Sequence, residues 1–320
     1  MIRRFELRDS LLVQRLTDRG VCFDFRTFHT NDLHLLRNAV FAGLFPAFLP
    51  ETHMIDRAGK PFGFAQLSHR GGNPSSRLRY FSPREISQLE PGSGLMEALL
   101  TEAGRRYAQH LLAEAEENTE QFGFLRREGF AVYARQDIWK GVLVHDIAGP
   151  QPEGMLRPLK SADEPAVLAL YSSVVPALVQ QVEGLPRPPS GWGLFEEGEL
   201  VGVFLLRIGP RGLWMEPFLH PGARHVAEWT AALTGLLEIS PARPLHVCVR
   251  SYQDWLGVIL RDFHFSLCGE QAVMARRVVV PVPSSQTLPL PAVEGGVSNV
   301  TTLQNIIPPK CYDTTTPNHR

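Results

Sequence analysis

The sequence lacks an excess of charge of either sign. Its 320 residues include 32 basic and 33 acidic side chains, which leave a formal net charge of −1 at pH 7. Proteins that bind duplex DNA or anionic membranes usually do so through a surplus of Lys and Arg. The near-neutral balance therefore argues against a nucleic acid or a membrane as the main partner.

Cysteine is scarce, and long apolar runs are absent. The four cysteines lie far apart and form no C-x-x-C pair, which excludes zinc-ribbon and thioredoxin motifs. No uncharged apolar run reaches the roughly 18 residues that a membrane-spanning helix needs. Residues 1–6 lack the apolar core of a secretory signal. These absences predict a cytoplasmic protein in a reducing compartment.

The length and the distribution of proline predict the domain organisation. A chain of 320 residues exceeds most single cores, so two domains are expected. The Pro- and Gly-rich residues 148–154 predict a linker. Seven prolines interrupt residues 281–320, which are expected to form a flexible tail. The predicted domains are therefore residues 1–147 and 155–280.

The two predicted domains repeat one order of elements. Each opens with a short strand and a polar helix start. A strand and a second strand that ends at a proline follow. Each then continues with a helix, an apolar strand and the end of a further helix. The last five matches pair 60–67 with 199–206, 77–83 with 212–221, 94–103 with 226–237, 110–115 with 244–249, and 125–130 with 260–265. Five matches in the same order predict a duplicated α/β domain.

The most specific pattern joins Asn118 to Gly129 and Phe130. Asn118 ends a predicted strand, a short helix follows, and Gly129 comes eleven residues later, before Phe130 and another strand. Glycine supplies the positive φ that ends a helix, and Phe130 is expected in the core. The alternative is that Asn118 and Gly129 are only helix caps. Together with the repeated order, this pattern resembles the GNAT N-acetyltransferases.

The resemblance implies an α/β fold with mixed sheets, made of two GNAT-like domains in tandem. It also implies acetyl-CoA as co-substrate, an amine acceptor and no metal. The cofactor would lie in the leading domain, where backbone amides at a helix start hold pyrophosphate and a strand edge pairs with the pantetheine arm. The residues implied for this site are Phe81, Ser82, Gly92, Ser93, Gly94, Leu95 and Asn118.

Some positions depart from the family pattern. Leu89 stands where the phosphate-binding turn usually has Gln or Arg. In the trailing domain, glycine and asparagine positions of the family are occupied by other residues, namely Ala227, Trp229, Gln253 and His264. These departures imply that the trailing domain is degenerate as a CoA site.

Acetyl transfer to an amine requires a base, donors for the oxyanion and an acid for the leaving thiolate. The acid of the family is often a tyrosine four residues before the glycine, where this chain has Leu125. Candidate acids or bases are Tyr80, Tyr133, Glu114, Glu116 and Glu216. The carboxylates are more often solvated strand or helix residues, and Tyr133 fits an ordinary half-buried strand residue. The catalytic residues therefore stay unassigned.

Two pairs of histidines and a cluster of phenylalanines are further candidates for function. The pairs His29/His34 and His220/His225 are each five residues apart, so the two members do not share a helical face and no metal site is expected. A cluster of phenylalanines is expected in the core or a domain interface, with a pocket wall as the alternative. Its members are Phe23, Phe25, Phe28, Phe41, Phe45 and Phe48.

Two functions follow from these observations. The first is an acyl-CoA-dependent N-acyltransferase that moves acetyl from acetyl-CoA to an amine of a small molecule or protein. The second is a catalytically inactive tandem GNAT protein that acts as an acyl-CoA-binding sensor or scaffold. The missing tyrosine at Leu125 favours the second, and the oligomeric state stays open in both.

Overall fold

A computed structural model describes residues 2–30, 39–40, 51–57, 60–69, 73–88, 94–141, 155–184, 191–224, 226 and 243–278. Residues 1–280 form one compact unit. The predicted linker 148–154, residues 227–237 of the predicted helix 226–237, and the predicted tail 281–320 lie outside the described residues. No described helix is long and apolar enough to cross a membrane.

The leading half alternates strands and helices around a sheet. Short 3-10 turns flank its helices at Leu7–Asp9, Thr17–Arg19 and Arg84–Gln88. Its described helices are α1 (Ser10–Leu16), α2 (Phe25–Thr30), α4 (Leu95–Gly104) and α5 (Glu120–Arg127). Its strands are β1 (Ile2–Arg4), β2 (Val21–Cys22), β3 (Glu51–Arg57), β4 (Lys60–His69), β5 (Ser75–Ser82), β6 (His110–Glu116) and β7 (Ala131–Gly141).

The trailing half repeats this order. Its described helices are α6 (Glu164–Val174), α7 (Ala177–Glu183) and α9 (Leu256–Asp262), with 3-10 turns at Ser161–Asp163 and Ser251–Gln253. Its strands are β8 (Met155–Pro158), β9 (Gly191–Glu196), β10 (Glu199–Ile208), β11 (Leu213–Leu219), β12 (Leu245–Arg250) and β13 (Ser266–Arg277). The mixed α/β architecture predicted from the sequence is confirmed.

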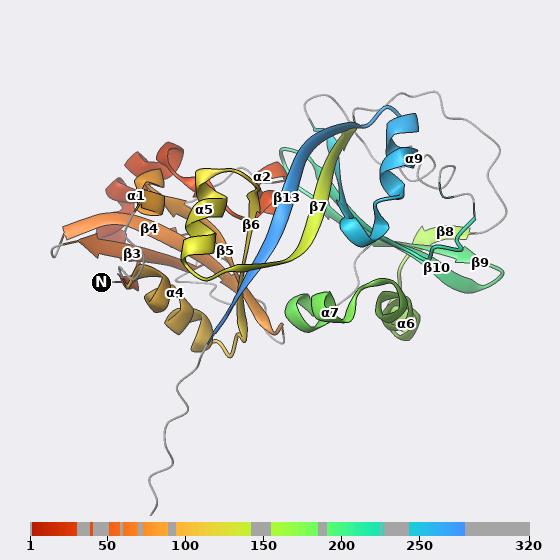
Figure 1. The fold of residues 1–320 in the computed structure, drawn as a ribbon, viewed down its shortest axis with the longest axis horizontal. Coiled ribbons are helices and arrows are strands. Elements are labelled where there is room, and N and C mark those ends of the chain that lie inside the picture. The colour runs from red at the N-terminus through yellow and green to blue at the C-terminus, as the bar shows by residue number, and fades with distance from the viewer. Residues whose placement is uncertain are drawn as a thin grey trace, which may run out of the picture. The chain divides into compact units, whose positions relative to one another are not determined.

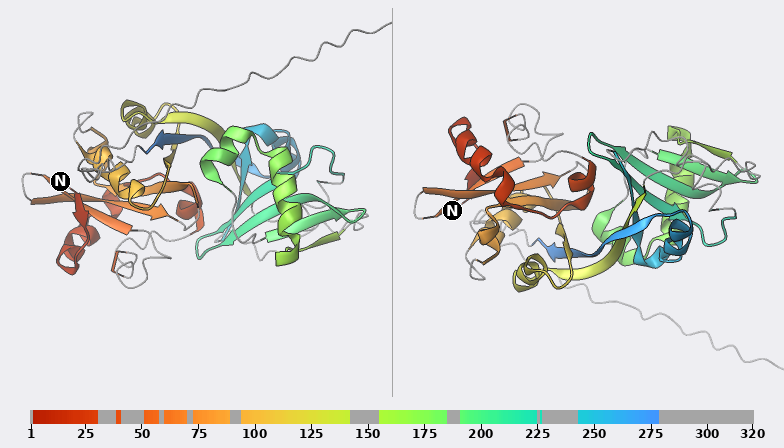
Figure 2. Two further views of the ribbon diagram at one scale, coloured as in Figure 1. Left: turned by 90° about the horizontal axis from the view of Figure 1, so that it is seen from below. Right: turned by 90° about the horizontal axis from the view of Figure 1, so that it is seen from above.

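Helices cover both faces of the strands in each half. In the leading half, α4 and α5 pack their apolar faces on one side, where Leu99, Phe124 and Phe130 are buried. The other side carries α1, whose Val13 packs against Phe64. In the trailing half α9 covers one face and α6 with α7 the other, as Figures 1 and 2 show. This sandwich of helix, sheet and helix follows from strands that are apolar on both faces.

The duplication is visible in matching side-chain contacts. Arg3 donates two hydrogen bonds of 2.7 Å to the carboxylate of Asp9, and Arg157 donates bonds of 2.7 and 2.8 Å to that of Asp163. In each half this forked pair joins the first strand to the following helix start. Gly129 and His264, the matched helix ends, both have left-handed backbones, with φ of 80° and 60°. The predicted helix stop at Gly129 is confirmed.

The two halves exchange their last strands. The sheet runs β1-β3-β4-β5-β6-β13-β7-β12-β11-β10-β9-β8, with β2 paired to β5. Thus β13 of the trailing half lies between β6 and β7 of the leading half, while β7 pairs with β12 of the trailing half. In Figure 1 the two long strands run side by side between the halves. Because this exchange joins the halves in one sheet, their division into domains 1–147 and 155–280 stays a prediction.

Gln136 of β7 faces Gln271 of β13, the matched strand that runs antiparallel beside it. The residues are register partners, and Gln136 Nε2 donates to Gln271 Oε1 at 2.8 Å. Both side chains are buried. Gln136 precedes its partner by 135 residues, the same offset that separates Gly129 from His264. The pair therefore marks the local two-fold axis of the duplication.

This pair should behave as a coupled unit. We expect Gln136→Leu to reduce the free energy of unfolding by about 1–3 kcal/mol, because it leaves the buried amide of Gln271 without its partner. Urea denaturation measures this change. The double variant Gln136→Leu/Gln271→Leu should recover part of the loss, since two apolar side chains then face each other. A double variant whose loss of unfolding free energy equals the sum of the losses of the two single variants would contradict the coupling.

Candidate functional site

A V-shaped notch opens in the sheet of each half where two parallel strands separate. In the leading half β5 and β6 are registered from Ser75/His110 to Arg77/Leu112 and then diverge. In the trailing half β11 and β12 are registered from Leu213/Leu245 to Met215/Val247 and also diverge. A divergence of this kind leaves backbone N–H and C=O groups without a strand partner, so each notch is a candidate site for a ligand with peptide-like groups.

The chain itself fills the notch of the leading half. Residues Val21 and Cys22 of β2 pair with Phe81 and Tyr80 on the free edge of β5. Phe23 then bridges the two diverging strands: its N–H donates to the carbonyl of Arg79 at 2.8 Å, and its carbonyl accepts from the N–H of Glu114 at 2.9 Å. The notch edges are thereby satisfied by backbone bonds within the chain.

The side chain of Phe23 occupies the floor of this notch. It is 1% exposed, and its ring lies 4.7 Å from that of Phe81, which in turn contacts Phe124 of α5 at 5.5 Å between centroids. Gly20 permits the approach of this segment, because a Cβ there would collide with the Tyr80 hydroxyl and the Phe81 carbonyl. The predicted core role is thus observed for Phe23, while Phe41, Phe45 and Phe48 lie outside the described residues.

The residues predicted to hold a cofactor are distributed around this filled notch. The backbone of Phe81 is registered with Ala65 on one side and Val21 on the other, and Ser82 Oγ donates to the carbonyl of Leu16 at 2.6 Å. Gly94 precedes α4 with a left-handed φ of 79°, and Leu95 is buried. Gly92 and Ser93 lie outside the described residues.

Asn118 follows β6 in a left-handed conformation, with φ of 68°. The N-cap of α5 is the next residue, Thr119, whose hydroxyl accepts from the N–H of Phe122 at 3.2 Å. The alternative that Asn118 serves only as the helix cap is therefore wrong. Phe130 is buried, as expected. Leu125 is also fully buried.

A side-chain amide covers the free strand edge in the trailing half. Gln253 Nε2 donates to the carbonyl of Pro217 at 2.9 Å, and Gln253 Oε1 accepts from the N–H of Leu219 at 2.7 Å. These two bonds imitate the pairing of a neighbouring strand along β11. Gln253 is 1% exposed, so the sequence position matched to Asn118 serves to close this notch. Arg224 is held by Glu196 and Glu197, and Ala227 and Trp229 lie outside the described residues.

Comparison with known proteins fits this geometry. No protein-family model and no curated protein matches the chain. A GCN5-related N-acetyltransferase from Sphaerobacter thermophilus is similar at a TM-score of 0.53 and 14% identity, over 88% of this chain and 96% of its own. A match over this share of the chain includes residues of both halves.

The chain has the GNAT fold. Two further structures have lower similarity: a tandem GNAT protein from the clavulanic acid biosynthesis pathway and a GNAT-family acetyltransferase from Colwellia psychrerythraea. The former is 13% identical over 88% of this chain and 99% of its own, with a TM-score of 0.47. The latter is 12% identical over 87% and 99%, with a TM-score of 0.42. The assignment of the fold rests on the Sphaerobacter structure and on the repeated halves.

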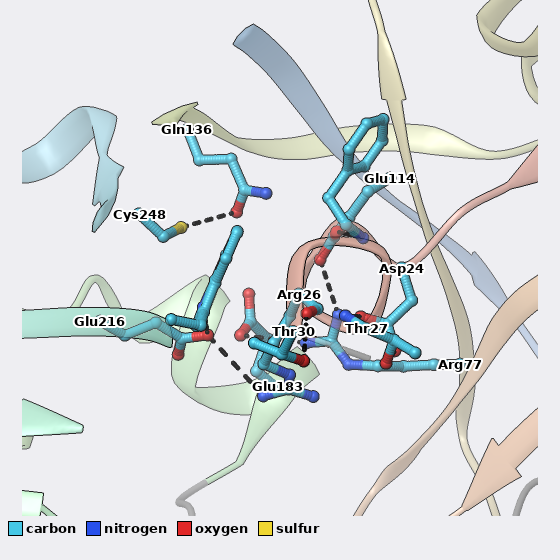
Figure 3. Close-up of polar contacts among 12 residues, drawn as sticks. Asp24, Arg26, Thr27, Thr30, Arg77, Glu114, Gln136, Glu183, Glu216 and Cys248 are labelled. Atoms are coloured by element: carbon cyan, nitrogen blue, oxygen red, sulfur yellow. Dashed lines mark hydrogen bonds and ion pairs between the residues drawn. The ribbon is translucent and has the colours of Figure 1, made fainter. Parts of the chain in front are cut away.

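A buried charged network lies on the GNAT sheet beside the filled notch (Figure 3). Arg77 Nη1 donates to Glu114 Oε1 at 2.9 Å, and its other nitrogen Nη2 lies 3.6 Å from Glu183 of the trailing half. Glu183 also pairs with Arg250 at 2.8 Å and accepts from the Tyr133 hydroxyl at 2.8 Å. The network therefore joins α7 and β12 of the trailing half to β5, β6 and β7 of the leading half.

Burial and pairing fix the protonation of these groups. Burial raises the pKa of Glu114, although the neighbouring Arg77 opposes the shift. Burial also tends to raise the pKa of Asp24, but Arg26 and Arg79 lower it below its usual value. Burial also tends to raise the pKa of Glu216, but positive neighbours, above all Arg26, lower it below its usual value. For Asp24 and Glu216 the positive neighbours thus outweigh burial, whereas for Glu114 burial outweighs Arg77.

Four of the five candidate acids and bases are engaged in contacts within the chain. The Tyr80 hydroxyl donates to the carbonyl of Thr17 at 2.6 Å, and burial raises its pKa to about 12. Tyr133 donates to Glu183, and burial raises its pKa well above the usual value. Glu114 and Glu216 are held in the network, whereas Glu116 is exposed. A pKa raised to this extent makes either tyrosine a poor source of a proton near neutrality.

The histidine pairs can be followed only in part, because His34 and His225 lie outside the described residues. His220 Nδ1 accepts from the N–H of Gly222 at 3.0 Å. His29 lies next to His246, a residue that sequence reasoning did not single out, with ring centroids 4.0 Å apart. No group of three or more potential metal ligands occurs among the described residues.

Proposed function

We propose that this chain is a catalytically inactive tandem GNAT protein that acts as a binding scaffold. The observation that carries the proposal is that the backbone and ring of Phe23 fill the notch of the leading half. A CoA thioester that paired with the edge of β5 at Phe81 would have to displace β2. The residues of the leading notch therefore do not fit that cofactor in this structure.

Two further observations support a scaffold. The amide of Gln253 covers the equivalent edge of β11 in the trailing half. Leu125 is fully buried where the resemblance implies a tyrosine acid, and the hydroxyls of Tyr80 and Tyr133 are both engaged. Among the described residues, the two strand edges are therefore covered, and the tyrosines considered as the acid are engaged.

The second candidate is an acetyl-CoA-dependent N-acyltransferase that acts on an amine of a small molecule or protein. Gly94 before α4 and Asn118 after β6, both with left-handed backbones, favour it. In that function Phe81, Ser82, Gly92–Leu95 and Asn118 would contact the cofactor. Residues 21–23 would first have to leave the notch, at the cost of their backbone hydrogen bonds.

Calorimetric titration with acetyl-CoA and CoA separates these functions. We expect the wild-type protein to show no binding up to roughly 1 mM, a limit equivalent to about −4 kcal/mol. The variant Phe23→Ala, which removes the ring from the notch, should also fail to bind. Phe64→Ala is the matched control, because Phe64 is equally buried but packs with α1 on the other face of the sheet.

Any binding of acetyl-CoA or CoA by the wild type or by Phe23→Ala would contradict the proposed scaffold function. Binding only by Phe23→Ala would identify the leading notch as a CoA site that the chain closes. Wild-type binding with thiol release in the presence of amines would establish an acyltransferase. Wild-type binding without thiol release would identify an acyl-CoA sensor.

A further inference from the structure

The segment that fills the leading notch continues directly into helix α2. Residues 21–23 are bonded to β5 and β6, and α2 begins two residues later, at Phe25. The leading half holds the start of this helix, since the N–H of Phe25 donates to Glu114 Oε2 at 2.9 Å. The carboxylate of Asp24 closes the first turn, because it accepts from the N–H of Thr27 at 3.3 Å and from its hydroxyl at 2.8 Å. Residues 21–30, which we call the strap, therefore form one hydrogen-bonded segment.

The far end of the strap is held by the trailing half. The carbonyl of Thr30, the last residue of α2, accepts from the N–H of Arg211 at 3.1 Å, in the turn between β10 and β11. Carbonyls at a helix end need such partners from outside the helix. Two glycines let the turn come this close. A Cβ on Gly209 would overlap the carbonyl of Thr30, and one on Gly212 would lie 2.8 Å from the carbonyl of His29.

Side chains of α2 add to this contact with the trailing half. The ring of His29 lies 4.0 Å from that of His246 on β12, and it stacks on Trp214 of β11 with centroids 5.9 Å apart. Burial lowers the pKa of His29 to about 3 and that of His246 to about 4, so both rings pack without charge near pH 7. Arg26 Nη1 lies 3.7 Å from Glu216 Oε1 of β11, and Figure 3 draws both residues. The strap is thus anchored in both halves.

We propose that the trailing half keeps the leading notch closed by holding α2. The strap is short and hydrogen-bonded, so residues 21–23 leave β5 and β6 only when α2 also leaves the trailing half. The free energy of opening then includes the contacts at both anchors, which makes the open state rarer. A half whose own strand edge is covered by Gln253 thereby controls access to the notch of the other half. The proposal goes beyond the scaffold function and does not rest on it, because the strap closes the notch to any ligand.

Two native thiols report whether the strap opens as one unit. Cys22 belongs to β2 within the strap and is partly buried, whereas Cys248 of β12 is buried. Phe25 of α2 packs against the apolar cluster that contains Cys248, so departure of α2 uncovers this thiol. In a Cys268→Ser/Cys311→Ser background, alkylation at mildly alkaline pH followed by mass spectrometry gives the rate at each thiol. Because covered thiols react only through openings, these rates measure the population of the open state.

Gly209→Ala tests the proposal by a change in the trailing half alone. The added methyl group must displace the carbonyl of Thr30. It should therefore speed the alkylation of both Cys22 and Cys248 by roughly tenfold, which corresponds to about 1.4 kcal/mol. Gly123→Ala is the matched control, because a Cβ there would meet only the end of a flexible side chain at 3.4 Å. Both rates in this control should match those of the unchanged background.

Global unfolding is the other route by which these thiols can react, and its rate rises steeply with urea because it exposes the whole core. Opening of the short strap should depend on urea only weakly. Leu260→Ala marks the global route, since Leu260 is buried under α9 in a cluster separate from the one that Phe25 contacts.

Three results would overturn the proposal. They are unchanged alkylation in Gly209→Ala, faster alkylation of Cys248 without Cys22, and an acceleration of Cys22 that rises with urea as steeply as in Leu260→Ala. The measurement uses no CoA, so its failure is distinct from a failure of the scaffold function.

Discussion

A chain that ends at Phe265, and so lacks β13, is expected to lose cooperative unfolding altogether. β13 pairs with β6 from Gln271 to Arg277 and with β7 from Ser266 to Ala275. Its removal exposes the inner edges of both strands and takes the fully buried Val273 and Met274 out of two cores. Each such side chain contributes about 1.5–3 kcal/mol, against a total stability of about 5–15 kcal/mol.

Circular dichroism during thermal denaturation measures this loss. A chain that ends at Val280 is the control, because it keeps β13 and removes only residues 281–320; its melting temperature should match that of the full chain. Adding a synthetic peptide of residues 266–280 to the shorter chain should restore part of the cooperative transition. A cooperative melt of the shorter chain within a few degrees of the control would show that the exchanged strand is dispensable.

The second large effect is expected at Arg77. Arg77→Met should reduce the free energy of unfolding by about 3–5 kcal/mol, because it leaves the buried carboxylate of Glu114 without its ion pair. Glu183 loses a nearby cation in the same variant but keeps Arg250. Urea denaturation of the variant and the wild type provides the measurement. The same change at Arg135, whose pair with Glu117 is exposed, should cost only about 0.2–1 kcal/mol.

The deficit of Arg77→Met should depend on pH. Burial already raises the pKa of Glu114, and loss of Arg77 should raise it further. A carboxyl group whose folded pKa is raised favours folding most below its unfolded pKa, and this contribution is lost as pH rises through the folded pKa. The variant should therefore approach wild-type stability as the pH falls from 7 towards 5. The double variant Arg77→Met/Glu114→Gln should lack this dependence, and a deficit that grows on acidification would contradict the argument.

The sequence predicts the features that local chemistry determines. Gly129 ends its helix with a left-handed backbone because glycine alone lacks the Cβ penalty there, and Phe130 follows into the core as expected. The repeated order of strands and helices is confirmed, since it depends on apolar periodicity within each segment. The GNAT fold could therefore be predicted before any partner of a strand was known.

The contents of the notches depend on contacts between distant segments. Residues 21–23 form too short an apolar run to predict a strand. The partners of Phe23, Arg79 and Glu114, lie far along the chain. Gln253 differs from asparagine by one methylene, and this added reach lets its amide contact Pro217 and Leu219. Sequence matching identifies such a residue as a departure from the family, but it does not reveal where the longer side chain binds.

The exchange of β7 and β13 changes what the loss of a binding site in one half would mean for this molecule. In a chain of independent domains, a copy that no longer binds a cofactor can be deleted without harm to its neighbour. Here the trailing half supplies the strand that lies between β6 and β7. Selection for a folded leading half would thus be enough to retain the trailing half, whether or not that half binds a ligand of its own.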